Sequence, residues 1–584
     1  MKQNAVRSWL VCVVCIVSLF VFASCGKGEE ENDSYMDLEK YFNITDISGY
    51  TSCAIVIDNS ILEQGIILEG SNVYIPYEIV RNKINNKFYV DNNENLLIYT
   101  TPDKVIDSEI GSKTYCLDTE ITFSVPTSLK IEDKIYIALE YCLLMEKNIK
   151  YKLDTNPNRL VIQTVLNNTV ASIKEDAKVR FEADPMSAIL FDVKQGDDVY
   201  LLEDMGAYSK VANTTGITGY IKSECIGSKK EEMLDLSYSP VVYEHEVRDY
   251  KICLGWHQLG SYGDNGSLNE LVSETMGLNV VSPTWYQICD GEGNFTSLSS
   301  KDYVDTAHSM GMEVWGLISD FNYDDENNMY YINEVLSKTS SRRQLIANLI
   351  EEVEITGMDG INIDFEKISS SNGEDYVEFI RELSIECRKQ DIVLSVDMYV
   401  PIESNLYYDR TSVGEVADYV ILMGYDEHWA GCGSAGSTAS LGFVTEGIVD
   451  TLMEVEPSRV INAIPFYTRV WSEIPEELSD ENAEIIEDSV FGNYSLESIA
   501  VGMGTAKRYL NDHNATLVWL EDCGQYYGEY KENGITYRIW LEEQESIGKK
   551  LEVMKEYNLG GIACWKLGLE INDVWEIIDE YVRE

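Results

Sequence analysis

The strongest constraint on the fold is a series of short apolar runs that recur through the C-terminal part of the chain. Helical patterns separate the runs, with amphipathic helices expected at 342–354 and 374–388. Buried strands that alternate with helices are typical of a barrel of parallel strands. The eight runs lie at 252–258, 279–285, 313–319, 360–366, 392–399, 419–425, 460–467 and 561–567. We therefore expect an α/β fold over 251–584, a (β/α)8 TIM barrel with an α+β lobe inserted at about 470–558.

The preceding chain predicts small β-rich accessory domains. A pattern of strand, helical turn and hairpin at 72–98 recurs at 134–161. This pair resembles the copper amine oxidase N-terminal-like repeat of bacterial surface proteins and predicts a twin repeat over 50–168. Neither copy carries a histidine cluster, so the interpretation is a spacer or a wall-contact module.

A second accessory domain is expected over 174–228, followed by a linker over 229–250. Short strands there end in Gly216-Ile217-Thr218-Gly219-Tyr220-Ile221, which resembles a bacterial Src-homology-three domain. In extracellular hydrolases such domains contact wall peptide or glycan. The alternative is a small β-barrel that only spaces the C-terminal unit.

The N-terminus has the pattern of an export signal. Lys2 and Arg7 precede an apolar run at 9–22 that is short for a membrane span. Its end, Phe22-Ala23-Ser24-Cys25, resembles a bacterial lipobox, which implies a lipoprotein signal peptide over 1–25, lipidation of Cys25 and a lipid anchor at the extracellular surface. An acidic linker over 26–49 would follow as a tether. The alternative is an ordinary signal peptide with an incidental cysteine.

Composition excludes several classes of partner. The chain has 45 Lys+Arg against 100 Asp+Glu, a formal charge of −55, so its field repels nucleic acid. With 38 Tyr and 10 Trp it is not a disordered chain. Beyond Cys25 the cysteines form no Cys-x-x-Cys pair, and none of the five His has a metal-ligand spacing, so we expect no metal and no cofactor.

The run at 360–366 carries the polar residues most suggestive of catalysis. Strand alternation places Asn362, Asp364 and Glu366 on one face, which points into the barrel, and Glu366 falls at the strand's C-terminal end, where barrel enzymes place their sites. Buried carboxylates are costly unless they serve each other or a ligand. A structural carboxylate pair or a magnesium site are the alternatives.

The longer string around this strand is more specific. Met358-Asp359-Gly360-Ile361-Asn362-Ile363-Asp364-Phe365-Glu366 resembles the Asp-Gly-x-Asp-x-Asp-x-Glu signature of glycoside hydrolase family 18, the chitinase and N-acetylglucosaminidase family. The family's later landmarks are matched in order by Met423-Gly424-Tyr425-Asp426, Pro465-Phe466-Tyr467-Thr468-Arg469 and Trp565. Ser282-Pro283-Thr284-Trp285 and 539–543 resemble the bacterial subgroup that includes spore-cortex enzymes.

The resemblance implies a retaining, substrate-assisted mechanism. Glu366 protonates the leaving oxygen, and the substrate's 2-acetamido carbonyl attacks the anomeric carbon. Asp364 holds the acetamide N–H, and its negative charge is expected to help keep Glu366 protonated. Tyr425 hydrogen-bonds the acetamido carbonyl. The other residues implied are Asn362, Asp426, Trp565, Tyr467, Arg469 and Trp285 for substrate binding, and Asp359 for structural support.

One departure from the family pattern bears on the chemistry, because Asn362 stands where many chitinases have Asp. An amide cannot share a proton with Asp364, so the pH profile should differ.

The sequence therefore predicts an extracellular hydrolase acting on glycans that contain N-acetylglucosamine, peptidoglycan first and chitin oligomers second. The alternatives are a non-catalytic, lectin-like glycan-binding protein on the same barrel, or a surface scaffold with a vestigial barrel.

Overall fold

The computed structural model describes residues 31–44, 49–165, 167–233, 241–480, 483–488 and 492–584, and these divide into two compact units. One unit combines the chain up to 85 with 128–239. The other combines 86–127 with 240–584. The expected signal peptide over 1–25, with Cys25, lies outside the described residues. Within the described part of the chain, no helix is both long enough and apolar enough to cross a membrane.

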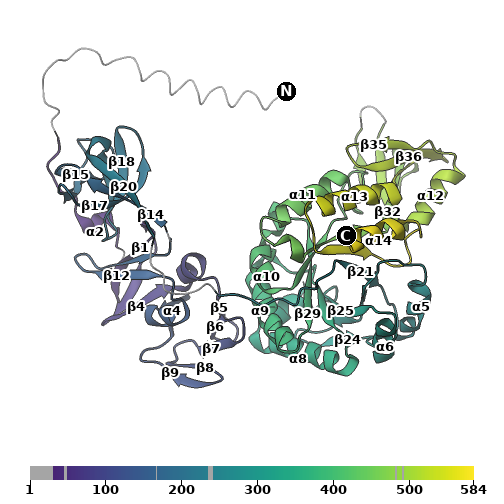
Figure 1. Cartoon of the computed structure of the whole chain (residues 1–584), viewed down its shortest axis with the longest axis horizontal. Coiled ribbons are helices and arrows are strands. Elements are labelled where there is room, and N and C mark those ends of the chain that lie inside the picture. Colours follow the sequence, from purple (N-terminus) through teal and green to yellow (C-terminus); the bar gives the residue numbers. More distant parts are fainter. Residues whose placement is uncertain (1–30, 45–48, 166, 234–240, 481–482, 489–491) are drawn as a thin grey trace, which may run out of the picture. The chain divides into compact units, whose positions relative to one another are not determined.

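The second unit contains the predicted (β/α)8 barrel (Figure 1). Neighbouring barrel strands pair in parallel, and the sheet closes because β21 pairs with β38 and β22 pairs with β25. Each predicted run holds one strand, which confirms the fold class. The strands are β21 (Ile252–His257), β22 (Val280–Pro283), β25 (Glu313–Ser319), β28 (Gly360–Asp364), β29 (Val393–Tyr399), β30 (Tyr419–Met423), β31 (Val460–Pro465) and β38 (Gly561–Trp565).

Strand alternation sorts the barrel core into an inner and an outer layer. In β21, Leu254 and Trp256 belong to the inner cluster while Cys253 belongs to the outer one. In β28, Ile361 and Ile363 pack outward against the helices. The polar residues between them therefore point inward, as the alternation predicts.

The covering helices follow the strands in the expected order. The two amphipathic helices predicted beside the fourth strand are α8 (Thr339–Thr356) and α9 (Gly373–Lys389). Gly357 ends α8 at a positive φ of 74°, a conformation that favours glycine. The others are α5 (Leu268–Leu271), α6 (Lys301–Ser309), α7 (Tyr331–Leu336), α10 (Arg410–Val416), α11 (Leu441–Thr451), α13 (Gln544–Glu556) and α14 (Val574–Arg583).

An inserted α+β lobe follows β31, as expected, and its bounds differ from the prediction. Its sheet has the order β33-β34-β32-β37-β36-β35, and helix α12 (Met503–Asp512) packs on it through Ala506 and Leu510. The strands are β32 (Tyr467–Pro475), β33 (Ile485–Ile486), β34 (Tyr494–Gly502), β35 (Val518–Leu520), β36 (Gln525–Glu532) and β37 (Ile535–Trp540). The lobe thus spans 467–540, because α13 already belongs to the helices of the barrel.

Residues 86–127, which we call the arm, form an antiparallel sheet that belongs to the barrel unit. It comprises β5 (Phe88–Asp91), β6 (Leu96–Thr100), β7 (Val105–Glu109), β8 (Thr114–Leu117) and β9 (Thr119–Thr122) in sequential order. The hairpin β5–β6 lies against α8 and α9 (Figure 1). By packing, therefore, the twin repeat expected as one domain over 50–168 divides between the two units, although its family resemblance stays a prediction.

The first unit consists of two sheets. One has the order β10-β11-β4-β3-β1-β13-β12, with the short β2 (Ser60–Ile61) paired to β1, and the other the order β16-β15-β19-β18-β17-β14-β20. The first holds β1 (Thr51–Ile57), β3 (Ile66–Glu69), β4 (Asn72–Pro76), β10 (Ser128–Ile131), β11 (Lys134–Ala138), β12 (Lys150–Asp154) and β13 (Arg159–Gln163). The second holds β14 (Asn167–Ile173), β15 (Ala177–Arg180), β16 (Ile189–Val193), β17 (Asp198–Asp204), β18 (Tyr208–Ala212), β19 (Thr218–Lys222) and β20 (Ile226–Met233).

Both expected linkers are shorter in the structure than in the prediction. In the stretch predicted as a tether over 26–49, Glu31 binds Arg180 at 3.0 Å, α2 (Leu38–Tyr41) forms, and Phe42 is buried. At the other linker, 241–250 belongs to the barrel unit, where Arg248 Nε lies 2.7 Å from Glu313 Oε1. Glu31, expected in an acidic tether, thus has Arg180 as a partner in the fold.

A buried ion pair anchors α13 to the residues that follow the lobe, and it gives a test of the fold. Lys550 Nζ lies 2.8 Å from Glu542 Oε1, both side chains are almost fully buried, and Glu542 also accepts hydrogen bonds from Gln525 and Ser546. Burial raises the pKa of the Glu542 carboxyl above its usual value.

We expect Lys550→Met to lower the free energy of unfolding by about 3 to 5 kcal/mol, because it leaves the Glu542 carboxylate buried without its cation. The matched control is Lys549→Met, which removes the neighbouring exposed lysine that pairs with Glu552 and should change stability little. Denaturant titration of both variants measures the difference, and equal stabilities would contradict the expectation.

Candidate active site

The polar face of β28 brings Asp364 and Glu366 to the C-terminal mouth of the barrel. Asp364 ends the strand, and Glu366 follows after the buried Phe365. The backbone N–H groups of Glu366 and Lys367 donate to the two carboxyl oxygens of Asp320, at 2.9 and 2.8 Å. The Tyr399 hydroxyl donates to Glu366 Oε2 at 2.5 Å. Groups from β28, β29 and the end of β25 thus fix the backbone and side chain of Glu366.

Asp364 and Glu366 line a cavity of about 540 Å³ in the barrel mouth. Its wall combines carboxylates with aromatic rings, which suits a sugar that offers both hydroxyl groups and an apolar ring face. The other lining residues discussed below are Asp397, Tyr425, Asp426, Tyr467, Trp256, Trp285 and Trp565.

A second cavity, of about 740 Å³, shares Glu366, Met423, Tyr425 and Asp426 with the first. Its remaining wall includes Lys367, Tyr399, Phe443, the exposed Trp429 and Arg469. Glu366 therefore stands where the two cavities meet, with room for a ligand on either side of its carboxyl group.

Burial controls the protonation of the carboxyl groups in the mouth. Asp364 and Asp397 are nearly inaccessible, and desolvation raises both pKa values well above the usual range. The charges of Asp397 and Glu366 add to the rise in the pKa of Asp364. For the pKa of Asp397, the hydrogen bond from Asn362 opposes the rise and the charge of Glu366 adds to it. Burial also raises the pKa of Asp320 to about 7, against the two N–H groups that favour its charged form. These shifts favour the neutral form of Asp364, whereas the sequence led us to expect a negative charge beside Glu366.

Asn362 lies beneath the cavity and does not line it. Its Nδ2 donates to Asp397 Oδ1 at 2.7 Å, while its Oδ1 accepts from Trp256 Nε1 at 2.9 Å and from Ser282 Oγ at 3.2 Å. The side chain is fully buried. The residue expected to bind substrate thus contacts Asp397 in place of Asp364, and it supports the floor of the site.

The predicted residues from strands six and seven converge on Asp426. Tyr425 lines both cavities, and burial raises the pKa of its phenol, which keeps the hydroxyl protonated. Asp426 has a positive φ of 59°, accepts a 2.6 Å hydrogen bond from Tyr467, and lies 3.9 Å from Arg469 NH2. The structure therefore brings Tyr425, Asp426, Tyr467 and Arg469 together at the boundary of the two cavities.

The tryptophans differ in their exposure to the site. Trp565 lines the first cavity and packs edge-on against Trp256, with 5.6 Å between ring centroids. Trp285 reaches the wall, but it is 1% exposed and donates to Asn265, so it belongs mainly to the core. Trp540 packs on Tyr527 in the lobe.

Asp359 lies at the opposite end of β28 from the cavity. Its Oδ2 accepts from the Val314 N–H at 2.8 Å and lies 2.8 Å from His308 Nε2. Asp359 therefore contacts the backbone of β25 and a helix of the barrel, away from the cavity.

Sequence reasoning missed Asp320, Asp397 and Tyr399. The sequence does place them where barrel enzymes have their sites. Ser395, Asp397 and Tyr399 occupy alternate positions of β29, and Asp320 directly follows β25. Recognising them required knowing that these strand ends face Glu366.

Comparisons with known proteins agree with this geometry. The family model described as Glycosyl hydrolases family 18 matches residues 322–570, a range that includes β28 and Glu366. Over these residues the barrel is therefore similar to glycosyl hydrolases of family 18.

Several curated relatives share this part of the chain. The uncharacterized glycosylase YvbX of Bacillus subtilis (strain 168) is 24% identical over 329 residues, which are 54% of this chain and 88% of that protein. The cortical fragment-lytic enzyme of Bacillus anthracis is 24% identical over 253 residues, 42% of this chain and 55% of the enzyme. Di-N-acetylchitobiase of Mus musculus is 24% identical over 239 residues, 38% of this chain and 64% of the enzyme. The chain thus spans little more than half of the cortical fragment-lytic enzyme.

Among solved structures, the spore cortex-lytic enzyme SleL of Bacillus cereus superposes with a TM-score of 0.48 at 19% identity, covering 61% of this chain and 77% of that one.

The raised carboxyl pKa values predict that stability falls as pH rises. A carboxyl group that keeps its proton in the folded state stabilises the protein fully below its unfolded pKa, and this contribution is lost as pH rises toward the folded pKa. We expect the free energy of unfolding to fall between about pH 5 and pH 8, with a limiting slope of about 1.4 kcal/mol per pH unit for each retained proton.

Asp397→Asn should reduce this slope, because the amide has nearly the shape of the neutral carboxyl group, can still accept from Asn362, and carries no titrating proton. Urea titrations of both proteins across that pH range measure the change. Parallel pH profiles for the two would show that Asp397 does not hold its proton in the folded state.

Proposed function

We propose that the protein is an extracellular glycoside hydrolase that cleaves β-1,4 bonds next to N-acetylglucosamine in peptidoglycan or chitin-like glycans, by a retaining, substrate-assisted mechanism. The observation that carries the proposal is the position of Glu366 where two cavities meet, with Asp364 and Tyr425 lining the first of them. A glycan can then place one sugar on each side of the acid.

In this proposal Glu366 donates its proton to the glycosidic oxygen as the bond to the anomeric carbon breaks. The carbonyl oxygen of the substrate's 2-acetamido group forms a bond to that carbon, giving an oxazolinium ion. Water then attacks the same carbon, Glu366 takes a proton from it, and the acetamide is restored. The two displacements together retain the configuration of the anomeric carbon.

Asp364 accepts the acetamide N–H and responds to the charge that develops. Burial and neighbouring carboxylates raise the pKa of Asp364 in the free site, whereas a positive oxazolinium ion beside it favours the ionised form. In this step Asp364 has released its proton to water when the substrate binds, and its negative charge stabilises the positively charged transition state more than the neutral bound substrate. Tyr425, kept protonated by burial, donates to the acetamido oxygen.

Peptidoglycan is the substrate that we favour, since both the accessory β-sheets and the resemblance to cortical fragment-lytic enzymes suit a wall glycan. We further propose that Cys25 is lipidated and anchors the protein at the bacterial surface, and that the first unit contacts or spaces it from the wall. No nucleic acid is expected as a partner of a chain with a charge of −55.

We expect Glu366→Gln to lower kcat by a factor of about 10² to 10⁴, the usual contribution of a general acid. The measurement uses protein that starts at residue 26, purified peptidoglycan and chitin oligomers, with reducing ends identified by mass spectrometry. The matched control is Glu403→Gln, which changes an exposed glutamate beyond β29 and should leave kcat unchanged.

A second substrate series tests the role of the acetamido group. Oligomers whose acetyl groups have been removed should bind and resist cleavage, while acetylated ones release a product that starts as the β anomer. Binding of both series with cleavage of neither would contradict the hydrolase and favour the lectin-like alternative.

A further inference from the structure

Helix α8 depends on the arm for the hydrogen bonds at its N-terminus. The residue before the helix, Lys338, offers no side-chain cap. The carboxylate of Asp91, at the end of β5, accepts from both the N–H and the hydroxyl of Thr339, at 2.7 and 2.6 Å. Glu94 Oε2 accepts from the Ser340 N–H at 2.8 Å. Acidic groups at a helix N-terminus also suit the helix dipole, so the arm completes α8.

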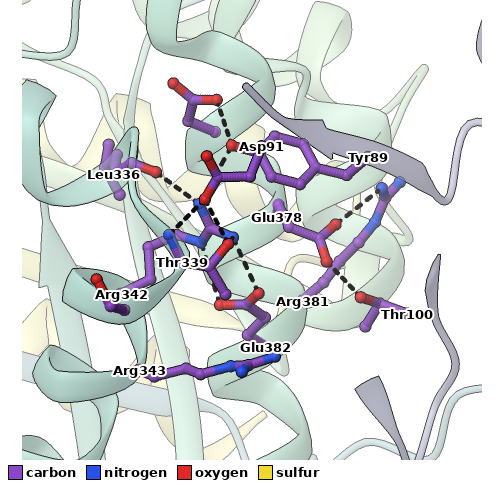
Figure 2. Close-up of polar contacts among 12 residues, drawn as sticks. Tyr89, Asp91, Thr100, Leu336, Thr339, Arg342, Arg343, Glu378, Arg381 and Glu382 are labelled. Atoms are coloured by element: carbon purple, nitrogen blue, oxygen red, sulfur yellow. Dashed lines mark hydrogen bonds and ion pairs between the residues drawn. The ribbon is translucent and has the colours of Figure 1, made fainter. Parts of the chain in front are cut away.

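A buried charge network joins the arm to both helices beside β28 (Figure 2). Arg342 of α8 is fully buried and lies 3.1 Å from Glu382 of α9. It also donates to the Leu336 carbonyl at 2.8 Å and to the Tyr89 hydroxyl at 3.1 Å. Tyr89, from β5 of the arm, therefore accepts a hydrogen bond from the buried guanidinium group of Arg342.

The hydroxyl of Tyr89 begins a path of hydrogen bonds toward the active site. It donates to Asp375 Oδ1, in the first turn of α9, at 2.7 Å. The other oxygen of Asp375 accepts from Asn372 Nδ2 at 2.7 Å. Asn372 Nδ2 also lies 3.2 Å from the Asn333 carbonyl oxygen.

Asn333 completes the path at the residues that follow Glu366. Its Nδ2 donates to the Lys367 carbonyl at 3.0 Å, and its Oδ1 accepts from the Ser369 N–H at 2.7 Å. The side chain is buried, so these two bonds have little competition from water. Asn333 thereby holds the loop 367–372, and its own carbonyl oxygen accepts from Asn372, which also donates to Asp375.

We propose that Tyr89 is a positioning residue for Glu366, which acts from the arm through Asp375, Asn372 and Asn333 on the loop 367–372. The inference rests on the proposed function for its catalytic consequence, and on the hydrogen bonds alone for its structural one. The catalytic unit then includes 86–127, a segment whose sequence lies far from the active-site motifs.

The test is Tyr89→Phe in the full chain, which removes the hydroxyl and keeps the ring that packs over Arg342. Thr100→Val is the matched control, because it also removes one buried hydroxyl of the arm, the one that bonds Glu378 of α9, and this bond is not on the path. Both variants should lower the unfolding temperature by similar amounts.

Only Tyr89→Phe should alter kcat and the hydrogen exchange of the loop that follows Glu366. We expect its kcat on the wall glycan to fall about fivefold, the effect of losing about one hydrogen bond, with KM nearly unchanged. Its amides at 367–372 should exchange hydrogen about fivefold faster in native-state exchange read by mass spectrometry, while those of Thr100→Val exchange at the wild-type rate.

The exchange measurement needs no substrate, so it separates the two proposals. If the wild-type protein cleaves no glycan, the proposed function is contradicted. The exchange result alone then tests whether Tyr89 positions the loop 367–372. Unchanged exchange at 367–372 in Tyr89→Phe, or an equal change in Thr100→Val, would overturn the positioning role.

A double-variant cycle tests the path itself. If Tyr89 acts through Asp375, the effects of Tyr89→Phe and Asp375→Asn on exchange at 367–372 should not add, and the double variant should resemble the stronger single one. Additive effects would show that the two residues act independently and would contradict the path.

Discussion

The removal of carboxyl groups from water at the barrel mouth is the constraint on which the site depends. Asp320 follows β25, Asp364 ends β28, and Asp397 lies two residues before the end of β29. These three neighbouring strands thus hold carboxyl groups that are almost inaccessible. A low dielectric favours the neutral forms of these carboxyl groups unless a hydrogen-bond donor or a cation compensates. A positively charged ligand in the cavity would therefore favour their ionised forms. The same burial lets Asp320 hold the backbone N–H of Glu366 and lets Asn362 hold Asp397.

The arrangement is supported from outside the barrel as well. In the chain, β28, which carries Asp364, lies between α8 and α9, and both helices form hydrogen bonds with the arm. Helix α8 lacks a side-chain cap from Lys338, and the buried Arg342 is satisfied by Glu382, by Tyr89 and by neighbouring carbonyl and hydroxyl groups. The arm and these two helices thus satisfy each other's polar groups, which accounts for the packing of 86–127 with the barrel unit.

Much of the barrel and part of the site could be predicted from local patterns. Strand alternation placed Asn362 and Asp364 inward, and the eight runs gave the order of the strands, because a half-buried or fully buried strand has a periodicity visible in sequence. Asp320 and Tyr399 could not be connected with Glu366 in the same way. Their sequence patterns give no distance between chain segments, and it is the parallel pairing of β25 and β29 with β28 that brings the ends of these strands together.

The sequence by itself determined the fold class, the position of the acidic strand and the identity of the polar residues on its inner face, since these follow from composition and local periodicity. Tertiary structure decided which carboxyl group meets which partner. Asn362 contacts Asp397 beneath the cavity, Trp285 joins the core, and Tyr89 lies against Asp375 and Arg342. Each is a contact between residues distant in the chain, set by the packing of the barrel and the arm, and packing of that kind leaves no periodic trace in the sequence.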